Sequence, residues 1–480
     1  MQKLKTWLFL LLLTFIGWQC NTNENVESKS NDSSASTDSR PNIILLVADD
    51  HGKDAIGAYG NPIIQTPNLD KLAASGTLFN RAFCTTASCS ASRSVILSGL
   101  HNHANGHFGH QHSYHHFSSF DNIKSFPVLL EENGYRTGRI GKYHVAPEKV
   151  YHFNTVFKEN ARSSMAMANK VTDFINEPNP FFLYFCFSDP HRGGGFAEEL
   201  PLQPDRFGNI PEGYPEVKPA VYDPADVIVP PFLSDTPETR AEIAQYYQSI
   251  SRLDQGVGRL FEILESSGKW DNTMIIYISD NGMAFPGAKT TLYEAGMNLP
   301  CIVKAPDQKN AQTTDALVNW TDLAPTIMDV AGIPNDSLFH GQSFKNVLDG
   351  EAGGRESVFA SHTFHEITMY YPMRVLRGDR YKLIVNLAHG LDYPFASDLY
   401  ESKTWQGIIN NNLETLGQKP IKEFLKRPLF ELYDLEKDPW ETRNLASDLQ
   451  YQEILQNMRG QIQVLQENTK DPWIYKWTYE

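Results

Sequence analysis

The segment NIILLVADD at residues 42–50 is the most informative about the fold, because it joins an apolar run directly to two adjacent carboxylates. A nearly continuous apolar run of this length predicts a strand buried on both faces, as in a parallel sheet. Asp49 and Asp50 then fall at the C-terminal end of the strand. Ligands bind at that edge in open α/β sheets. This one segment therefore predicts both a central sheet and the position of a site on it.

Two later segments repeat the arrangement. FFLYFCFS at 181–188 precedes the run DPHR at 189–192, and TMIIYIS at 273–279 precedes Asp280-Asn281-Gly282. Residues 239–267 have apolar side chains at helical spacing and predict a long helix between these strands. We predict an α/β domain whose large, mixed and mostly parallel sheet is flanked by helices, with polar residues gathered along one sheet edge.

A smaller α+β region with an antiparallel sheet is expected after the main domain. The segments that predict it are MRVLRGDRYKLIVN at 373–386 with a turn at Gly378-Asp379, the strand-like run PLFELYD at 428–434, and an amphipathic helix at 451–468. We predict a main domain at residues 41–348 and a C-terminal subdomain at residues 349–480.

The N-terminus predicts an exported protein. Residues 1–19 combine lysines with an apolar run too short to span a bilayer, as in a signal peptide. Cys20 follows, where a lipoprotein is acylated, although Gln19 stands where a small residue is usual; a plain secretory signal is the alternative. The polar residues 20–40 predict a flexible tether. We expect a periplasmic or lipid-anchored outer-membrane location in a Gram-negative bacterium, with the cell surface as a further option.

Composition excludes one class of partner and gives a cysteine inventory. The net charge is −15, with 57 acidic and 42 basic residues, so binding of nucleic acid is not expected. The five cysteines form no CxxC pair and no disulfide framework. Cys186 and Cys301 lie in apolar runs and are predicted to be buried thiols.

The segment CSASRSVILSG at residues 89–99 carries the strongest chemical signal. Arg93 lies one helical turn after Cys89 and faces the same way. Alone, the segment could be a buried thiol before a helix capped by Ser92. The longer block AFCTTASCSASRSVILSGLHNHANG resembles the signature of the formylglycine-dependent (type I) sulfatases, C-x-[PA]-x-R followed by an apolar helix and glycine.

This resemblance implies an alkaline-phosphatase-like fold and conversion of Cys89 to formylglycine (3-oxoalanine). An aldehyde hydrates to a geminal diol, one hydroxyl of which attacks sulfur while the other later expels sulfate. That is covalent catalysis with a built-in release step. Arg93 would hold the diol and balance nearby carboxylates.

The same resemblance implies one Ca²⁺ ion. Its ligands would be Asp49, Asp50, Asp280, Asn281 and the hydroxyl of residue 89, a hard oxygen set that suits Ca²⁺. Either pair alone would more simply be a loop cap or a turn. Two such pairs on two buried strand ends, together with the cysteine motif, indicate a metal site.

Four further residues match sulfate-binding and proton-transfer positions of the family. Lys142 and His144 in GKYH are two residues apart on an extended segment and point the same way. His191 resembles the leaving-group histidine, and Lys289 in GAKTTLYEAG a sulfate-binding lysine. The implied roles are charge neutralisation by both lysines, proton uptake from the diol by Asp280, proton donation by His191, and help in the elimination by His144.

Residues 101–116 contain seven of the fifteen histidines. A zinc cluster is disfavoured because the spacing is irregular and no cysteine accompanies the histidines. We predict instead that this segment lines the substrate cleft, with His103 and His110 as contacts.

Within the family, the resemblance is greatest to heparan N-sulfatases (sulfamidases). It extends through FFLYFCFSDPHR, YDPADVIVPPFLSDTPETRAEI, FELYDLEKDPWETRNLA and SHTFHEITMYYPMRVLR. The last block suggests His365, Glu366 and Arg374 as substrate contacts; a structural turn and a surface arginine are the alternatives.

The substrate is expected to be a sulfated glycan. Heparan-type N-sulfoglucosamine is one candidate, and an algal polysaccharide such as ulvan is the other, because KTTLYEAG resembles generic sulfatases. Ala91 stands at the position where proline is commoner, which favours an anaerobic radical maturase as the partner that makes formylglycine.

Two other functions remain as alternatives. A phosphatase or phosphotransferase of the alkaline phosphatase type would use Ser or Thr with two zinc ions, against which Cys89 argues. An inactive glycan-binding lipoprotein would be expected to have lost some of the basic residues Lys142, His144, His191 and Lys289, all of which are present.

Overall fold

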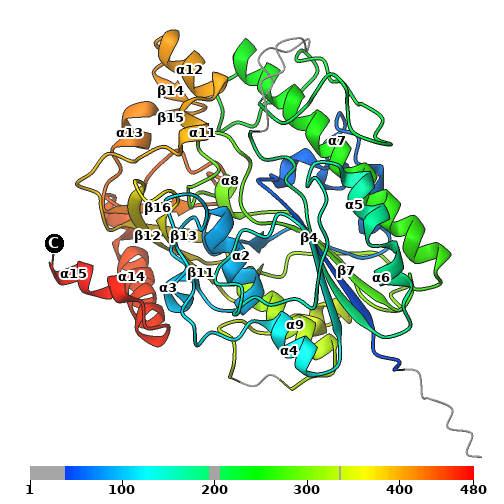
Figure 1. Cartoon of the computed structure of the whole chain (residues 1–480). Helices are drawn as coiled ribbons and strands as arrows, with labels where there is room; N and C mark the ends of the chain where they lie inside the picture. The colour runs from blue at the N-terminus through cyan, green and yellow to red at the C-terminus, as the bar shows by residue number, and fades with distance from the viewer. Residues whose placement is uncertain (1–37, 194–205, 335–336, 480) are drawn as a thin grey trace, which may run out of the picture. The chain divides into compact units, whose positions relative to one another are not determined.

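An eight-stranded sheet runs through the protein in the order β5-β4-β6-β1-β7-β8-β2-β9 (Figure 1). The structure, a computed structural model, describes residues 38–193, 206–334 and 337–479. The signal peptide, Cys20 and most of the tether predicted from the sequence lie outside these residues.

The three strands predicted from the sequence lie side by side. Strand β1 (Asn42–Ala48) pairs in parallel with β6 (Phe181–Cys186) on one edge and with β7 (Thr273–Ser279) on the other. Strands β7 and β8 are antiparallel, as are β8 and β2, so the sheet is mixed and mostly parallel, as predicted. The other strands are β2 (Thr77–Phe79), β4 (Arg136–Gly141), β5 (Thr155–Val156), β8 (Cys301–Lys304) and β9 (Gln312–Thr314).

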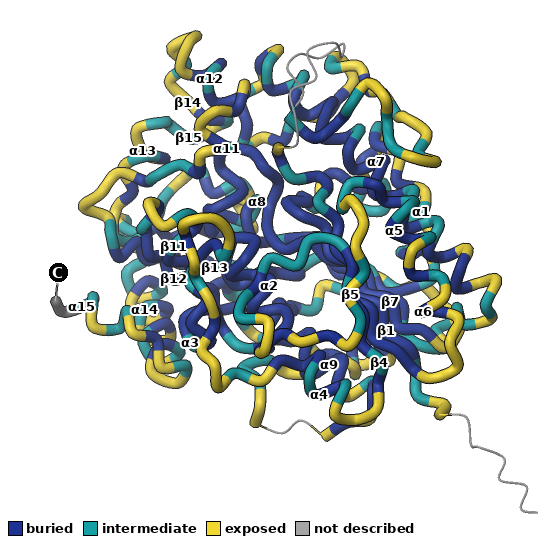
Figure 2. The backbone as a smooth tube through the Cα atoms, in the orientation of Figure 1, coloured by how far each residue is buried: buried dark blue, intermediate teal, exposed yellow. Residues whose placement is uncertain are grey.

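Helices cover both faces of this sheet. Successive residues of β1 point to opposite sides, and because nearly all of them are apolar, both faces must be buried. Ile43, Leu45 and Val47 join one hydrophobic cluster, and Ile44, Leu46 and Ala48 join the other. Figure 2 shows the strands of the main sheet as a buried layer in the interior. The first face carries α2 (Cys89–Ser98), α4 (Phe126–Glu132) and α9 (Leu323–Val330), and the second carries α1 (Pro67–Ala74), α5 (Ser164–Lys170), α6 (Thr172–Asn176) and α7 (Pro237–Ser266).

Helix α7 is the long helix predicted from residues 239–267. It begins where Thr236 caps it, because the Thr236 side chain accepts a hydrogen bond from the amide of Thr239. Pro237 occupies the first turn, where its missing amide hydrogen leaves no helical bond unmade.

The predicted antiparallel sheet is present in the C-terminal part. It consists of β11 (Val358–Phe364), β12 (Tyr370–Arg377), β13 (Tyr381–Asn386) and β16 (Phe430–Asp434), in that order. Helix α14 (Gln452–Asn468) packs on it through Leu455, Met458 and Ile462. Side chains of β11 and β12 also enter the core of the main sheet, so residues 38–480 form one unit and the boundary at 348/349 stays a prediction.

Shorter elements connect these layers. They are α3 (Asn102–Asn105), α8 (Glu294–Met297), α10 (Lys345–Leu348), α11 (Ser397–Tyr400), α12 (Lys403–Asn410), α13 (Ile421–Leu425) and α15 (Lys476–Tyr479), with the strand pairs β3 (Ala82–Phe83) and β10 (Val318–Asn319), and β14 (Thr415–Leu416) and β15 (Lys419–Pro420). Cys186 and Cys301 are buried free thiols, as predicted. Among the described residues, every helix is too short or too polar to span a bilayer.

Candidate active site

The ends of β1 and β7 bring three carboxylates together. Ala48 pairs with Ser279, so the residues that follow each strand emerge side by side. The Asp50 amide donates to Asp280 Oδ1 at 3.1 Å, and Asn281 Nδ2 donates to Asp50 Oδ1 at 2.5 Å. Asp50 has a φ of 67°, a left-handed conformation that costs energy outside glycine and is concentrated at functional sites. The side chains of Asp49, Asp50, Asp280 and Asn281 are all fully buried.

Cys89 is the first residue of α2 and lies against this cluster. Its Sγ is 3.7 Å from Asp50 Oδ1. Ligand atoms of Asp49, Asp50, Cys89 and Asp280 all lie within 4.8 Å of one another. A helix N-terminus favours negative charge, here at residue 89. Burial raises the pKa of the Cys89 thiol well above its usual range despite the nearby Lys142 ammonium, so the unmodified thiol stays protonated and is a poor nucleophile.

The cluster fits a hard divalent cation. Asp49 Oδ1 and Asn281 Oδ1 are buried and have no hydrogen-bond partner among the described residues. Burial, together with the neighbouring aspartates Asp49 and Asp50, raises the pKa of Asp280 to about 7 against the effect of Arg93. Like charges packed together disfavour ionisation, and a cation relieves that repulsion. The donors are the oxygens that Ca²⁺ prefers.

Each carboxylate also has its own basic partner. Arg93 Nε donates to Asp280 Oδ2 at 2.8 Å, and Lys142 forms an ion pair with Asp49. Lys289 Nζ donates to Asp50 Oδ2 at 2.9 Å. The fixed positive charges thus surround the carboxylates, and a bound cation would leave the site with an excess of positive charge that suits an anionic substrate.

The segment after β4 places Lys142 and His144. Gly141 has a φ of 82°, and a Cβ there would lie 1.9 Å from the Cys186 carbonyl oxygen, so glycine is required. Ser90 Oγ donates to the His144 carbonyl at 2.6 Å, which ties this segment to the residue beside Cys89.

His191 follows β6 and reaches the same centre. Its Nε2 lies 3.2 Å from Lys289 Nζ and 3.8 Å from Asp50 Oδ2. Burial and the nearby Lys289 and Lys142 ammonium groups lower the pKa of His191 to about 4. The imidazole is therefore neutral near pH 7 and accepts a hydrogen bond from Lys289.

Asp398 belongs to this centre but was not predicted from the sequence. Lys289 Nζ donates to Asp398 Oδ2 at 2.8 Å. Burial acts to raise the pKa of Asp398, but Lys289 outweighs it and holds the pKa at about 2. The two residues are 109 positions apart. The local sequence ASDLYES contains no motif that marks the aspartate.

Glu366, predicted as a substrate contact, makes its observed bonds to the start of α11. Its carboxylate accepts from the Ser397 amide at 2.9 Å and from Ser397 Oγ at 2.7 Å. Because Asp398 is the next residue, Glu366 fixes the position from which Asp398 reaches Lys289.

The histidine-rich segment divides between the site and the interior. His110 Nε2 lies 3.0 Å from His365 Nε2, and His112 Nδ1 lies 2.6 Å from His144 Nε2. The ring centroids of His110 and His144 are 5.1 Å apart, so His110 and His365, both expected near substrate, lie close to His144. The nitrogens of His110, His112 and His144 come within 4.8 Å of one another, a grouping that the irregular spacing did not predict.

The prediction that His103 contacts substrate is wrong. His103 is 2% exposed, and its two nitrogens bond to Ser361 Oγ at 2.8 Å and Thr469 Oγ1 at 2.9 Å. Both polar atoms are used inside the fold, so His103 joins the C-terminal strands and helix to α3.

The prediction for Arg374 is wrong for a similar reason. Its side chain is fully buried and binds Asp471 through two donors, with Nη2 2.7 Å from Asp471 Oδ1. Nη1 donates to the carbonyls of His362 and Met373. Arg374 is thus neither a substrate contact nor a surface arginine, but half of an internal ion pair.

Comparison with known proteins agrees with this geometry. The family model described as Sulfatase matches residues 41–333, and the one described as N-sulphoglucosamine sulphohydrolase, C-terminal, matches residues 287–393. Human N-sulphoglucosamine sulphohydrolase is 38% identical over 90% of this chain and 91% of its own length. An ulvan-active sulfatase of Formosa agariphila is 27% identical over 98% of this chain and 91% of its own.

Solved structures share the fold at lower identity. A protein in complex with its substrate D-glucosamine-2-N,6-O-disulfate gives a TM-score of 0.67 at 21% identity, over 90% of this chain and 99% of that one. A 2-O GAG sulfatase gives 0.66 at 22%, over 90% and 93%. The fold and site define a hydrolase of sulfate esters or sulfamates. The chain belongs to the sulfatase family, with its alkaline-phosphatase-like fold.

Proposed function

We propose that the protein removes sulfate from N-sulfoglucosamine units of heparan-type glycans. The observation that carries the reaction is the cluster at residue 89, where three buried carboxylates are each paired with a basic side chain. The sugar is supported by the 38% identity to the human sulphohydrolase across both matched regions.

The nucleophile we propose is formylglycine made from Cys89. The raised pKa of the Cys89 thiol supports this, because a protonated thiol cannot attack sulfur efficiently. A hydrated aldehyde at this position would place an oxygen beside Asp50 and under the positive end of α2. Ala91 supports an anaerobic radical maturase as the partner that performs the conversion.

One Ca²⁺ ion is proposed among Asp49, Asp50, Asp280, Asn281 and residue 89. The unpartnered oxygens of Asp49 and Asn281 support it. When bound, the ion supplies positive charge that polarises a sulfate oxygen.

The protein's own side chains would then divide the remaining work. Lys142 and Lys289 neutralise sulfate oxygens. Asp280, held in place by its hydrogen bond from Arg93, takes a proton from the hydroxyl of residue 89. The negative charge of sulfate raises the pKa of His191, which lets the imidazole take a proton and deliver it to the leaving nitrogen or oxygen. His144, tied to Ser90, assists the elimination that restores the aldehyde.

An ulvan-type polysaccharide is the second candidate substrate. It is favoured by Lys289 in its generic sulfatase segment and by the 27% identity to an ulvan-active sulfatase. The test is to incubate the matured protein with N-sulfated heparin disaccharides and with ulvan oligosaccharides, and to measure released sulfate. Cys89→Ala is the control. Release from ulvan alone would replace the proposed sugar, and release from neither would refute both substrates.

The export and anchoring of the protein rest on its N-terminal sequence. We propose a periplasmic or outer-membrane location with Cys20 acylated. Metabolic labelling with a fatty acid should mark the wild-type protein and not Cys20→Ser. Equal labelling of both would contradict the anchor.

A further inference from the structure

A cavity lies beside the sulfate site and is lined by the continuations of the loops that carry its carboxylates. Its volume is about 500 Å³, within the range of roughly 300–1,000 Å³ typical of small-molecule sites. The loop after β1 continues from Asp50 into its lining at residues 52–55, and the loop after β7 continues from Asn281 to Met283. None of the residues assigned above to sulfate, metal or proton transfer lines this cavity.

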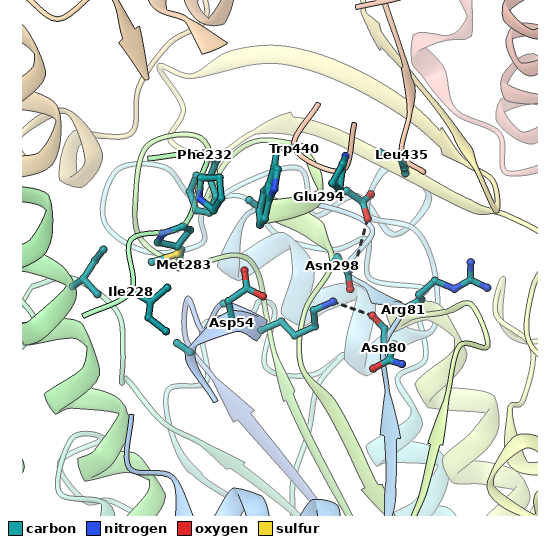
Figure 3. A pocket seen from close by; sticks show the side chains of 18 of the residues that line it. Asp54, Asn80, Arg81, Ile228, Phe232, Met283, Glu294, Asn298, Leu435 and Trp440 are labelled. Carbon is teal, nitrogen blue, oxygen red and sulfur yellow. Dashed lines mark hydrogen bonds between the residues drawn. The ribbon is translucent and has the colours of Figure 1, made fainter. Parts of the chain in front are cut away.

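The two walls of the cavity differ in chemistry (Figure 3). One wall is apolar, with Phe232 and Trp440 as its aromatic surface; their ring centroids are 6.4 Å apart and the rings are tilted by 33°. Both rings are only partly buried. The opposite wall presents Asp54, Asn80 and Asn298.

Polar atoms on this lining lack partners in the described part of the chain. Asn298 Oδ1 and Arg377 Nε are buried without a hydrogen-bond partner. Arg377 is 6% exposed. Among the described residues, the Asp54 carboxylate makes no hydrogen bond to another side chain, whereas Lys53 Nζ already donates to the Asn80 carbonyl at 3.0 Å. The cavity thus offers free acceptors and a free donor opposite an aromatic surface.

The two arginines around the cavity are paired with carboxylates, and the neighbouring Lys53 and Asp54 carry opposite charges. Arg81 binds Asp379, and Arg377 Nη2 lies 3.4 Å from Glu294 Oε2. A strongly anionic ligand therefore gains little from these cations. A purely apolar ligand would leave Asn298 Oδ1 and Arg377 Nε buried and unpaired, which is unfavourable.

We propose that this cavity is a saccharide-binding site separate from the sulfate site. A pyranose ring has an apolar C–H face, which fits Phe232 and Trp440, and a rim of hydroxyls that both donate and accept, which fits Asp54, Asn298 and Arg377. The ligand is a neutral or weakly charged sugar unit of a glycan. Its contact with the enzyme would hold a polymer near the catalytic centre, so this inference takes its choice of glycan from the proposed function.

Calorimetric titration of the Cys89→Ala protein tests the proposal without turnover. The probes are desulfated, N-acetylated heparin tetrasaccharide and desulfated ulvan oligosaccharide, which lack the group that the sulfate site recognises. At least one probe should bind, with little dependence on salt because the local charges are paired. Trp440→Ala in the same background should weaken binding about tenfold, the size of a lost aromatic contact.

Matched variants separate this site from general damage. Trp477→Ala removes another partly buried indole outside the cavity and should leave binding unchanged. Asn298→Leu keeps the branched shape of the side chain, removes the free acceptor, and should weaken binding even if Trp440→Ala folds poorly. Failure of both probes to bind, or binding unaffected by Trp440→Ala and Asn298→Leu in folded protein, overturns the proposal. Sulfate release by the matured wild-type enzyme is measured separately, so failure of the proposed function is recognised independently.

Discussion

Two buried arginines show how a reactive centre differs from a structural one. Arg93 and Arg374 are both fully buried, and each binds an aspartate through its guanidinium. Around Arg374 every guanidinium nitrogen has a protein acceptor. Around Arg93, by contrast, Nη2 and the nearby Asp49 Oδ1 have no hydrogen-bond partner among the described residues and lie 3.7 Å apart.

Between these two arginines, the difference lies in unmet hydrogen-bonding capacity rather than in burial or charge. Leaving a buried polar atom unpaired is unfavourable, so such atoms are rare in an interior unless something else binds them. The saturated pair of Arg374 and Asp471 holds the last helical segments to β12, whereas the unsaturated group around Arg93 keeps atoms free for a ligand.

The largest expected effect is loss of the nucleophile. Cys89→Ala should lower sulfate release by about four orders of magnitude or more, because removing a nucleophile leaves only binding contributions. The substitution removes only the terminal part of one small side chain, so circular dichroism and the melting temperature should stay close to wild type. Measurable turnover near the wild-type rate would refute a role for residue 89.

Arg374→Ala should instead damage stability. Breaking a buried ion pair from one side leaves Asp471 charged and unpaired, which lowers the free energy of unfolding by about 3–5 kcal/mol. Urea unfolding measures this loss. Sulfate release per folded molecule should change little, and a large drop in that rate would restore Arg374 as a site residue.

Arg93→Ala should show the opposite pattern. It removes the positive charge beside Asp280 and is expected to lower kcat by about 10²–10³, the range for loss of one charge-stabilising donor. Both kcat and the free energy of unfolding should be measured for Arg93→Ala and for Arg374→Ala. Equal activity losses in the two variants would contradict the division between a reactive and a structural arginine.

Asp398→Asn should have a smaller effect at the edge of the same centre. The change removes one charged acceptor of Lys289, and kcat/KM is expected to fall about tenfold, the worth of one charge-assisted hydrogen bond. Asp398→Glu should recover part of the loss. Glu366→Gln, which weakens the hold on Ser397, should have a weaker effect in the same direction.

The smallest effect is the pH dependence of the structural pair. Burial acts to raise the pKa of Asp471, but Arg374 outweighs it and holds that pKa well below its usual range. A depressed carboxylate pKa contributes stability above the unfolded value, about 3.9, and loses it as pH falls. The difference in unfolding free energy between wild type and Arg374→Ala should therefore be full at pH 7 and shrink below about pH 4. A gap independent of pH would exclude this ion pair as its cause.

Much of the site was predictable because its residues directly follow the strands that place them. Asp49, Asp50, Asp280 and Asn281 lie at ends of strands whose apolar runs are visible in the sequence, and Cys89 begins a helix recognisable from its motif. Parallel strands share one C-terminal edge, so local sequence determines that these groups meet.

The packing of distant segments determines which further side chains join the site and which lie elsewhere in the interior. Asp398 joins Lys289 from 109 residues away, and Arg374 meets Asp471 from 97 residues away. His103 turns into the interior, while His110 and His365 gather at His144. Sequence periodicity fixes the direction of a side chain on its own strand or helix, but its partner depends on how elements far apart in the chain pack. That packing assigned the ionic and histidine partners that no local motif contains.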